Sequence, residues 1–190
     1  MRTRDMAAVA GVLAAVLFGA GCGADGGERG AGAGSGGFGR EAAQAEIRAA
    51  VAGAGLPKSE LPEPGEVTAT ATPADERERI AQRAAVCTAA WQYIGPVVDG
   101  ARGKFDRTVE ALVGEGWTAG KRSEEKLDDK GGTHVGLTLK KSGWSLFARH
   151  STSKTVAMDM ISFQASEDAC MNGFSEREMD LLFGEDRERP

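Results

Sequence analysis

Residues 133–163 have the sequence THVGLTLKKSGWSLFARHSTSKTVAMDMISF, and this stretch decides the predicted fold. Apolar and polar residues alternate along most of it, with a period of two that is typical of half-buried β-strands. Short runs of Ser, Thr and Gly, which favour turns, separate the alternating segments. Because short turns join antiparallel neighbours, we expect an antiparallel meander. Its predicted strands are Thr133–Lys141, Trp144–His150 and Thr155–Phe163.

The turn at Ser142-Gly143 also predicts how the first two strands pair. A shift of one residue would set Leu139 against Ser145, so apolar pairing favours the register given by a two-residue loop. That register pairs Leu139 with Leu146, Leu137 with Ala148, and Lys141 with Trp144.

In the third strand of the meander, apolar residues occupy both sets of alternating positions, so they point to both faces of the sheet. Val156, Met158 and Met160 can continue one face of the sheet, whereas Ile161 and Phe163 fall on the other. This pattern predicts a bulge, or a strand that is covered on both sides.

Upstream of the meander, apolar residues recur with a helical period. Thr72-Pro73 is typical of a helix start, and the pattern predicts an amphipathic helix that ends before Gly95-Pro96. The stripe of this helix consists of Ile80, Ala84, Cys87, Trp91 and Ile94.

Three further elements complete the predicted domain. Residues 102–113 show Phe105, Val109 and Leu112 on one helical face, and Trp117–Leu127 has the period of a fourth strand. Ser175–Glu178 matches a capping box, which predicts a short C-terminal helix. We therefore expect an α+β fold over residues 73–184, with two to three helices packed on a four-stranded antiparallel sheet, followed by a polar tail at 185–190.

The residues before this domain predict little packed structure. Residues 22–39 are dominated by glycine, which predicts a flexible tether. Residues 40–72 predict an Ala-rich helix near Glu41–Ala54, whose weak apolar stripe leaves its docking open, and a Pro-rich connector. Val67–Thr72 fits either a short edge strand or more linker.

The first 22 residues carry a targeting signal. Arg2 and Arg4 precede a short apolar run, and the run ends in Gly19-Ala20-Gly21-Cys22. Such a pattern is typical of a secretory signal peptide over residues 1–21. The segment Gly19–Cys22 resembles the lipobox of bacterial lipoproteins. This resemblance implies acylation of Cys22 and anchoring at the extracytoplasmic face of a cell membrane. A plain signal peptide cut near Ala20 and an uncleaved anchor are the alternatives.

The number of cysteines agrees with this resemblance. Three cysteines leave one unpaired in an oxidising compartment, and acylation of Cys22 would remove the odd one. Cys87 and Cys170 then remain as a predicted disulfide, which would connect the first core helix to the end of the sheet.

The charge of the chain limits the classes of partner. The formal net charge is -5, which argues against binding to nucleic acid and against gripping anionic lipid through a basic face. Membrane attachment is instead expected through the acyl chains on Cys22.

Few residues in the chain suggest catalysis or metal binding. His134 and His150 are the only histidines, and the predicted register places them on opposite sheet faces as surface or edge residues, so no metal site is expected. Ser151–Lys154 and Ser123–Lys126 match the Ser-x-x-Lys motif of penicillin-recognising enzymes but lack its partner motifs. The acidic residues of the predicted turn at 128–132 lack the spacing of a calcium loop. No cofactor is expected.

Two groups of aromatic residues remain as candidates for binding. Trp91, Trp117 and Trp144 are expected in the core, with a ligand pocket between helix and sheet as the alternative. Phe147 alternates with the core-facing Leu146 and therefore belongs to the other face of the sheet. There it defines a candidate partner surface, unless the helix near Glu41 covers it. This surface consists of Phe147, Arg149, Lys140 and Thr138.

Together these features predict a lipid-anchored, non-catalytic binding or interaction module of the cell envelope, with an envelope protein as a candidate partner. The alternative is a small-molecule carrier or sensor lipoprotein. A hydrolase acting on cell-wall material would need acidic residues converging in a cleft, which the spacing does not predict.

Overall fold

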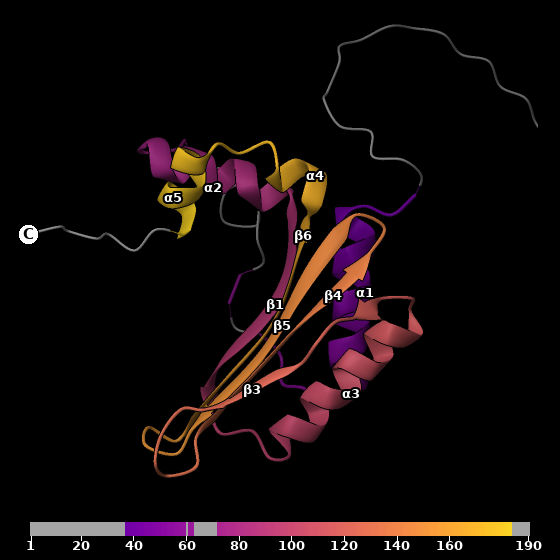
Figure 1. Cartoon of the computed structure of the whole chain (residues 1–190), viewed down its shortest axis with the longest axis vertical. Helices are drawn as coiled ribbons and strands as arrows, with labels where there is room; N and C mark the ends of the chain where they lie inside the picture. Colours follow the sequence, from indigo (N-terminus) through magenta and orange to yellow (C-terminus); the bar gives the residue numbers. More distant parts are fainter. Residues whose placement is uncertain (1–36, 60, 63–71, 184–190) are drawn as a thin grey trace, which may run out of the picture. The chain divides into compact units, whose positions relative to one another are not determined.

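The central element of the protein is an antiparallel sheet of six strands, seen in a computed structural model that describes residues 37–59, 61–62 and 72–183. The strand order is β1-β6-β5-β4-β2, and β3 also pairs with β4 (Figure 1). The predicted α+β class is confirmed, whereas the prediction of four strands is wrong. The strands are β1 Thr88–Pro96, β2 Thr118–Ala119, β3 Ser123–Lys126, β4 Thr133–Lys141, β5 Trp144–Ser153 and β6 Met158–Glu167.

Five helices accompany the sheet in the described residues, rather than the two to three that were predicted. The two longest helices pack against each other and on the same face of the sheet, which we call the inner face (Figure 1). Their buried side chains form the main core together with alternate residues of the strands. The helices are α1 Arg40–Gly53, α2 Glu76–Val86, α3 Ala101–Gly114, α4 Asp168–Met171 and α5 Glu176–Phe183.

The hairpin of β4 and β5 has the predicted register. Leu139 lies opposite Leu146, Leu137 opposite Ala148, and Lys141 opposite Trp144. At the turn, Ser142 and Gly143 have φ angles of 48° and 79°. Two consecutive positive φ values are those of the tight turn whose twist matches antiparallel strands, and glycine adopts this conformation without a steric penalty.

The predicted helix through Ile94 is wrong in its second half. Its helical part is α2, which begins after an Asp75 cap and ends at Val86, and the next residues form β1. The Thr88 hydroxyl donates to the Ala84 carbonyl at 2.9 Å and so satisfies a free helix end. Residues 88–96 include aromatic and β-branched side chains, and their pairing with β6 outweighs the helical spacing.

Helix α1 docks firmly on the sheet, a point that the sequence left open. Ala43 and Ile47 of α1 are fully buried. The Gln44 side chain donates to the Ala90 carbonyl and accepts from the Ala90 amide, while Arg40 donates to the Thr88 carbonyl. These three bonds use backbone groups on the free edge of β1, as a neighbouring strand would, and thereby protect part of that edge.

The N-terminal side of α1 also takes part in the core. Phe38, which lies in the predicted tether, packs edge-on against Trp117 at 5.8 Å and Trp144 at 6.4 Å. Trp117 Nε1 donates to Glu46 at 2.8 Å, and Lys141 forms an ion pair with the same carboxylate. These contacts join the start of α1 to the ends of α3 and β4.

Strand β6 has neither the predicted bulge nor the alternative cover on both faces. It pairs residue by residue with both β1 and β5. Ile161 and Phe163 point into the core, whereas Met160 is 46% exposed and Val156 lies in the preceding turn. The apparent change of parity arises because the apolar methionines belong to the outer face.

The strand predicted at 117–127 is interrupted. Only Thr118–Ala119 and Ser123–Lys126 pair with β4, and residues 120–122 lie between them. A Cβ on Gly120 would lie 3.0 Å from the Thr138 carbonyl oxygen, so this close approach of the two backbones favours glycine.

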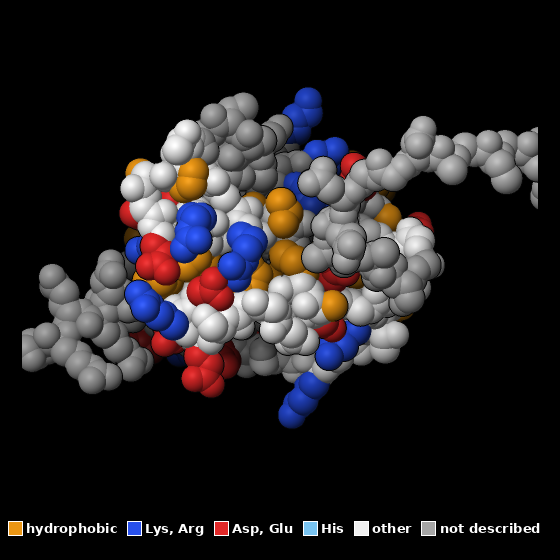
Figure 2. Space-filling view, turned by 90° about the horizontal axis from the view of Figure 1, so that it is seen from above, with side chains coloured by type: hydrophobic (Ala, Val, Ile, Leu, Met, Phe, Trp, Pro, Cys, Tyr) orange, Lys and Arg blue, Asp and Glu red, His pale blue; other side chains and the backbone are white. Residues whose placement is uncertain are grey.

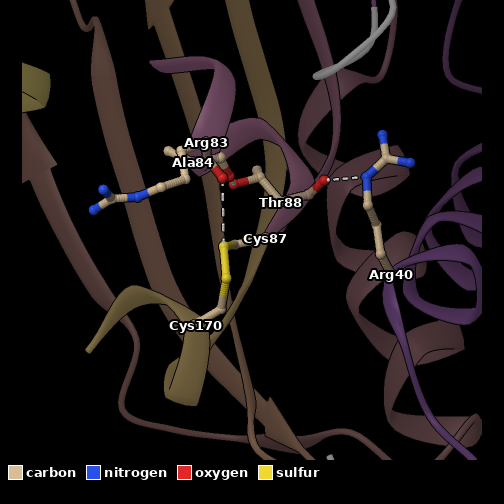
Figure 3. Close-up of a disulfide and its surroundings, with 6 residues drawn as sticks. All are labelled: Arg40, Arg83, Ala84, Cys87, Thr88 and Cys170. Carbon is tan, nitrogen blue, oxygen red and sulfur yellow. Dashed lines mark hydrogen bonds between the residues drawn. A yellow bond between two sulfur atoms is a disulfide. The ribbon is translucent and has the colours of Figure 1, made fainter. Parts of the chain in front are cut away.

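A second, smaller core lies around the predicted disulfide. Cys87 caps the C-terminal end of α2 and is bonded to Cys170 of α4, with their Cα atoms 5.9 Å apart (Figure 3). Ile80 and Phe174 are buried beside Cys87, and helix α5 packs against α2. The capping box is confirmed, because the Ser175 amide donates to Glu178 at 2.8 Å and the Glu178 amide donates back to Ser175 Oγ.

The surface at the α2 and α5 end is mixed in charge. Figure 2 looks down on this end and shows Lys and Arg interspersed with Asp and Glu. Ion pairs there include Arg83 with Glu178 at 2.9 Å and Arg177 with Glu76 at 3.6 Å. Among the described residues, no helix is both long and apolar enough to cross a membrane.

Candidate functional site

A groove of about 250 Å³ lies on the outer face of the sheet, opposite the face that carries α1 and α3. The predicted partner residues Phe147, Arg149 and Thr138 line it, whereas Lys140 lies outside it, opposite Ser145. Because α1 packs on the inner face, it does not cover Phe147, which is 41% exposed. The remaining lining residues are Lys121, Ser123, His134, Gly136, Leu137 and Ala148.

Gly136 forms the floor of this groove. It lies in the middle of β4, directly between Ser123 on β3 and Arg149 on β5. The residues two positions away on β4 are His134 and Thr138, which share its face. A Cβ at Gly136 would lie 3.3 Å from Ser123 Oγ and 3.5 Å from His134 Nε2. The missing side chain therefore leaves a hollow enclosed by polar groups.

The groove has two cations that lack carboxylate partners in the part of the chain that the structure describes. Neither Lys121 nor Arg149 forms an ion pair with any described residue, and the Arg149 guanidinium lies 5.9 Å from the centre of the Phe147 ring. Among the outward-facing residues of the described strands, Glu125 is the one carboxylate, and it pairs across from His134. In a chain with a net charge of -5, this outer face is locally cationic.

His134 is held in place by a neighbouring strand. Its Nδ1 lies 2.7 Å from Ser151 Oγ, directly across β4 and β5. This hydrogen bond orients the ring and leaves Nε2 on the side of the Gly136 hollow. His134 is only partly exposed, and the prediction that the two histidines lie on opposite faces is confirmed.

His150 is buried, so the prediction of a surface or edge position is wrong for this residue. It is 2% exposed and packs against Phe105 of α3 at 5.9 Å between ring centres. Its Nε2 lies 3.5 Å from Asp159 Oδ1, and neither atom has a hydrogen-bond partner among the described residues. Asp159 is anchored through its other oxygen, which accepts from the Val98 amide at 2.8 Å.

Burial dominates the electrostatics of His150. It lowers the pKa of the imidazole below its usual value, because the charged form loses its hydration, and the negative charge of Asp159 opposes this only in part. His150 therefore belongs to the core and not to a surface site.

The three tryptophans occupy the core, as predicted. Trp91, Trp117 and Trp144 are each less than 10% exposed. Trp91 lies 6.1 Å from Phe163, and Phe105 of α3 stacks on the same ring at 5.4 Å. These rings fill the space between the helices and the sheet where the alternative carrier pocket was predicted.

The remaining motifs do not assemble a reactive site in the described part of the chain. Ser123 and Ser151, the serines of the two Ser-x-x-Lys matches, lie on strands and not at a helix start. The Asp128 carboxylate accepts from the amides of Lys130 and Gly132, as in an ordinary turn. No group of three His, Cys, Asp or Glu side chains is placed to bind a metal among residues 37–59, 61–62 and 72–183.

Sequence reasoning identified one side of the groove and missed the other. Phe147, Arg149 and Thr138 were predicted from parity, but Gly136, Lys121 and Ser123 were not. A glycine within an otherwise regular strand is a known sign of close approach by a ligand or backbone, and this signal was present at Gly136. Cys22 and the predicted signal peptide lie outside the described residues.

Comparisons with known proteins leave the site to be judged on its own chemistry. No family model, no curated protein and no solved structure matches this chain.

Proposed function

We propose that this chain is a lipid-anchored protein of the bacterial cell envelope and a non-catalytic binding module that uses the outer face of its sheet. The groove over Gly136 carries the proposal, because it combines an exposed aromatic ring with two cations that have no carboxylate partner among the described residues. Phe147, Lys121 and Arg149 are all exposed, so their ring and charges are accessible to a ligand. The lipid anchor is proposed from the lipobox-like sequence before Cys22.

The packing of the core favours the outer face over a pocket between helix and sheet. Phe163 contacts both Trp91 and Phe105 in that space, so a carrier function there would require these rings to move. Moving such rings would give up packing contacts of the kind whose loss on truncation of a buried Phe or Trp to Ala costs about 3–5 kcal/mol. The outer groove needs no such rearrangement.

Membrane attachment is tested with Cys22→Ala. We expect the wild-type chain to sediment with the membranes of its bacterium and the variant to appear in the soluble fraction, because the acyl chains would be lost. Continued membrane association of the variant would contradict lipid anchoring through Cys22.

Binding through the outer face is tested by capture from solubilised envelope with the full chain as bait. The double variant Phe147→Ala/Arg149→Gln removes the ring and one cation, while Arg79→Gln removes an equal charge from the exposed surface of α2. The proposal expects one component to bind saturably to the wild type and to Arg79→Gln, and at least tenfold less to the double variant. Equal capture by all three would contradict a role for this face.

A further inference from the structure

We infer that the groove over Gly136 binds a small ligand that carries an oxyanion, either carboxylate or phosphate, on a flat ring. The oxyanion would lie between Arg149 and Lys121, and the ring would lie on Phe147. The inference rests on the proposed function, since it names the chemical class of ligand for the same surface.

The arrangement of charges around Gly136 favours binding of an anion. Arg149 is directly opposite Gly136 on β5, and both residues line the groove, where glycine contributes no side chain. The planar fork of arginine matches the geometry of carboxylate and phosphate oxygens, and charge-assisted bonds of this kind are about twice as strong as neutral ones. Lys121 lines the same groove and adds a second positive charge.

Neutral polar side chains border the site of the predicted anion. Ser123 Oγ and His134 Nε2 lie next to the position of a Gly136 Cβ, and Thr138 lines the same groove. Ser123 Oγ donates to the Gly136 carbonyl at 3.2 Å, and the Ser151 contact fixes the His134 ring. The polar groups are thus positioned before any ligand arrives, which reduces the cost of binding.

Phe147 accounts for the ring of the ligand. Its side chain is 41% exposed, lies opposite Thr138, and carries the Arg149 guanidinium 5.9 Å from its centre. Exposed aromatic rings offer a flat apolar surface at a small cost in conformational entropy. A volume of about 250 Å³ fits a ligand of one ring and one anionic group better than a long chain.

The test is an NMR titration of the full chain, labelled with ¹⁵N and purified in a nonionic detergent. Phenyl phosphate and benzoate are the probes, and benzyl alcohol is the neutral control. We expect saturable shifts of the Gly136 and Arg149 amides with at least one anion, with a Kd on the order of 1 mM for a ligand of this size. The anion that binds more tightly identifies the preferred oxyanion, and benzyl alcohol should bind at least tenfold more weakly.

Three variants locate the site. Arg149→Gln should weaken binding at least tenfold by removing the fork, and Gly136→Ala should do the same by filling the floor. The latter should keep the fold, since the added Cβ would meet the side chains of Ser123 and His134 and no backbone atom. Arg79→Gln, which removes an equal charge from α2, should bind like the wild type.

The inference would be overturned if neither anion gave saturable shifts, if benzyl alcohol bound as tightly as the anions, or if Arg149→Gln and Gly136→Ala bound like the wild type. The capture experiment separates this result from the proposed function. If capture depends on Phe147 and Arg149 while the probes fail to bind, the ligand class is wrong and the binding face remains.

Discussion

Reduction of the Cys87–Cys170 disulfide should remove a large part of the stability of the domain. The bond joins residues 83 positions apart in the sequence. In the chain-entropy model, a crosslink that closes a loop of this length destabilises the unfolded state by about 4.5 kcal/mol at 25 °C. Since small domains are stable by only about 5–15 kcal/mol, the reduced protein should be marginally stable.

The structure also predicts where the loss appears first. Cys87 immediately precedes β1, and Cys170 follows closely on the end of β6, so the bond clamps one end of the β1–β6 ladder. Strand β1 is an edge strand held by residues about 70 positions away in the sequence. We therefore expect its amides to exchange with solvent sooner than those of β5 after reduction.

Urea unfolding at 25 °C, with and without a reductant, measures the effect. The wild type and Cys22→Ala should both lose about 4–5 kcal/mol on reduction, whereas Cys87→Ala/Cys170→Ala should be weak from the start and insensitive to reductant. A loss below about 1 kcal/mol in the wild type, or equal sensitivity of the double variant, would refute the reasoning.

Three further predictions follow from single residues. Burial holds the pKa of His150 below its value in the unfolded chain, so the unfolded state binds a proton first as the pH falls. The free energy of unfolding should therefore decrease below about pH 6.5. In urea titrations, His150→Gln should make this decrease smaller. Gly143→Ala should lower the free energy of unfolding by about 1–2 kcal/mol, because the φ of Gly143 is 79°. Gly53→Ala, at the end of α1, should leave the free energy of unfolding unchanged. Equal urea midpoints for the two variants would contradict the turn geometry. The hydrogen bond from Arg83, with those from Ser175, lowers the pKa of the Glu178 carboxyl to about 2. The stability that this carboxylate contributes is therefore present above about pH 4.5 and is lost as the pH falls toward 2. An NMR titration should find the lowered pKa, and Arg83→Ala should raise the pKa of Glu178.

The candidate site was only half predictable from the sequence. Phe147, Arg149 and Thr138 were identified because their parity is opposite to that of the apolar face of the β4–β5 hairpin. Lys121 lies between β2 and β3, and Ser123 begins β3. Because the strand is interrupted there, the alternation of residues could not predict which face of the sheet they would join. His150 was placed at the surface although its register partner, Val135, belongs to the core, so the alternation along β5 already contained the signal for its burial.

What the sequence by itself determined is local. The β4–β5 register follows from a two-residue turn and apolar alternation within about ten residues on either side, and the capping box of α5 follows from four consecutive residues. The disulfide followed from counting cysteines. In each case the deciding interactions lie close together in the chain, or are covalent.

What only the tertiary structure decided depends on distant partners. Residues 88–94 fit a helical stripe in the sequence, and they form a strand because β6, about 70 residues away, supplies the backbone partners and α1 covers the edge. Helix α1 has a weak apolar stripe of its own and docks because the inner face of the sheet buries that stripe completely. The groove exists because three strands bring Ser123, Gly136 and Arg149 side by side, and such a neighbourhood is created by pairing and not by any one segment.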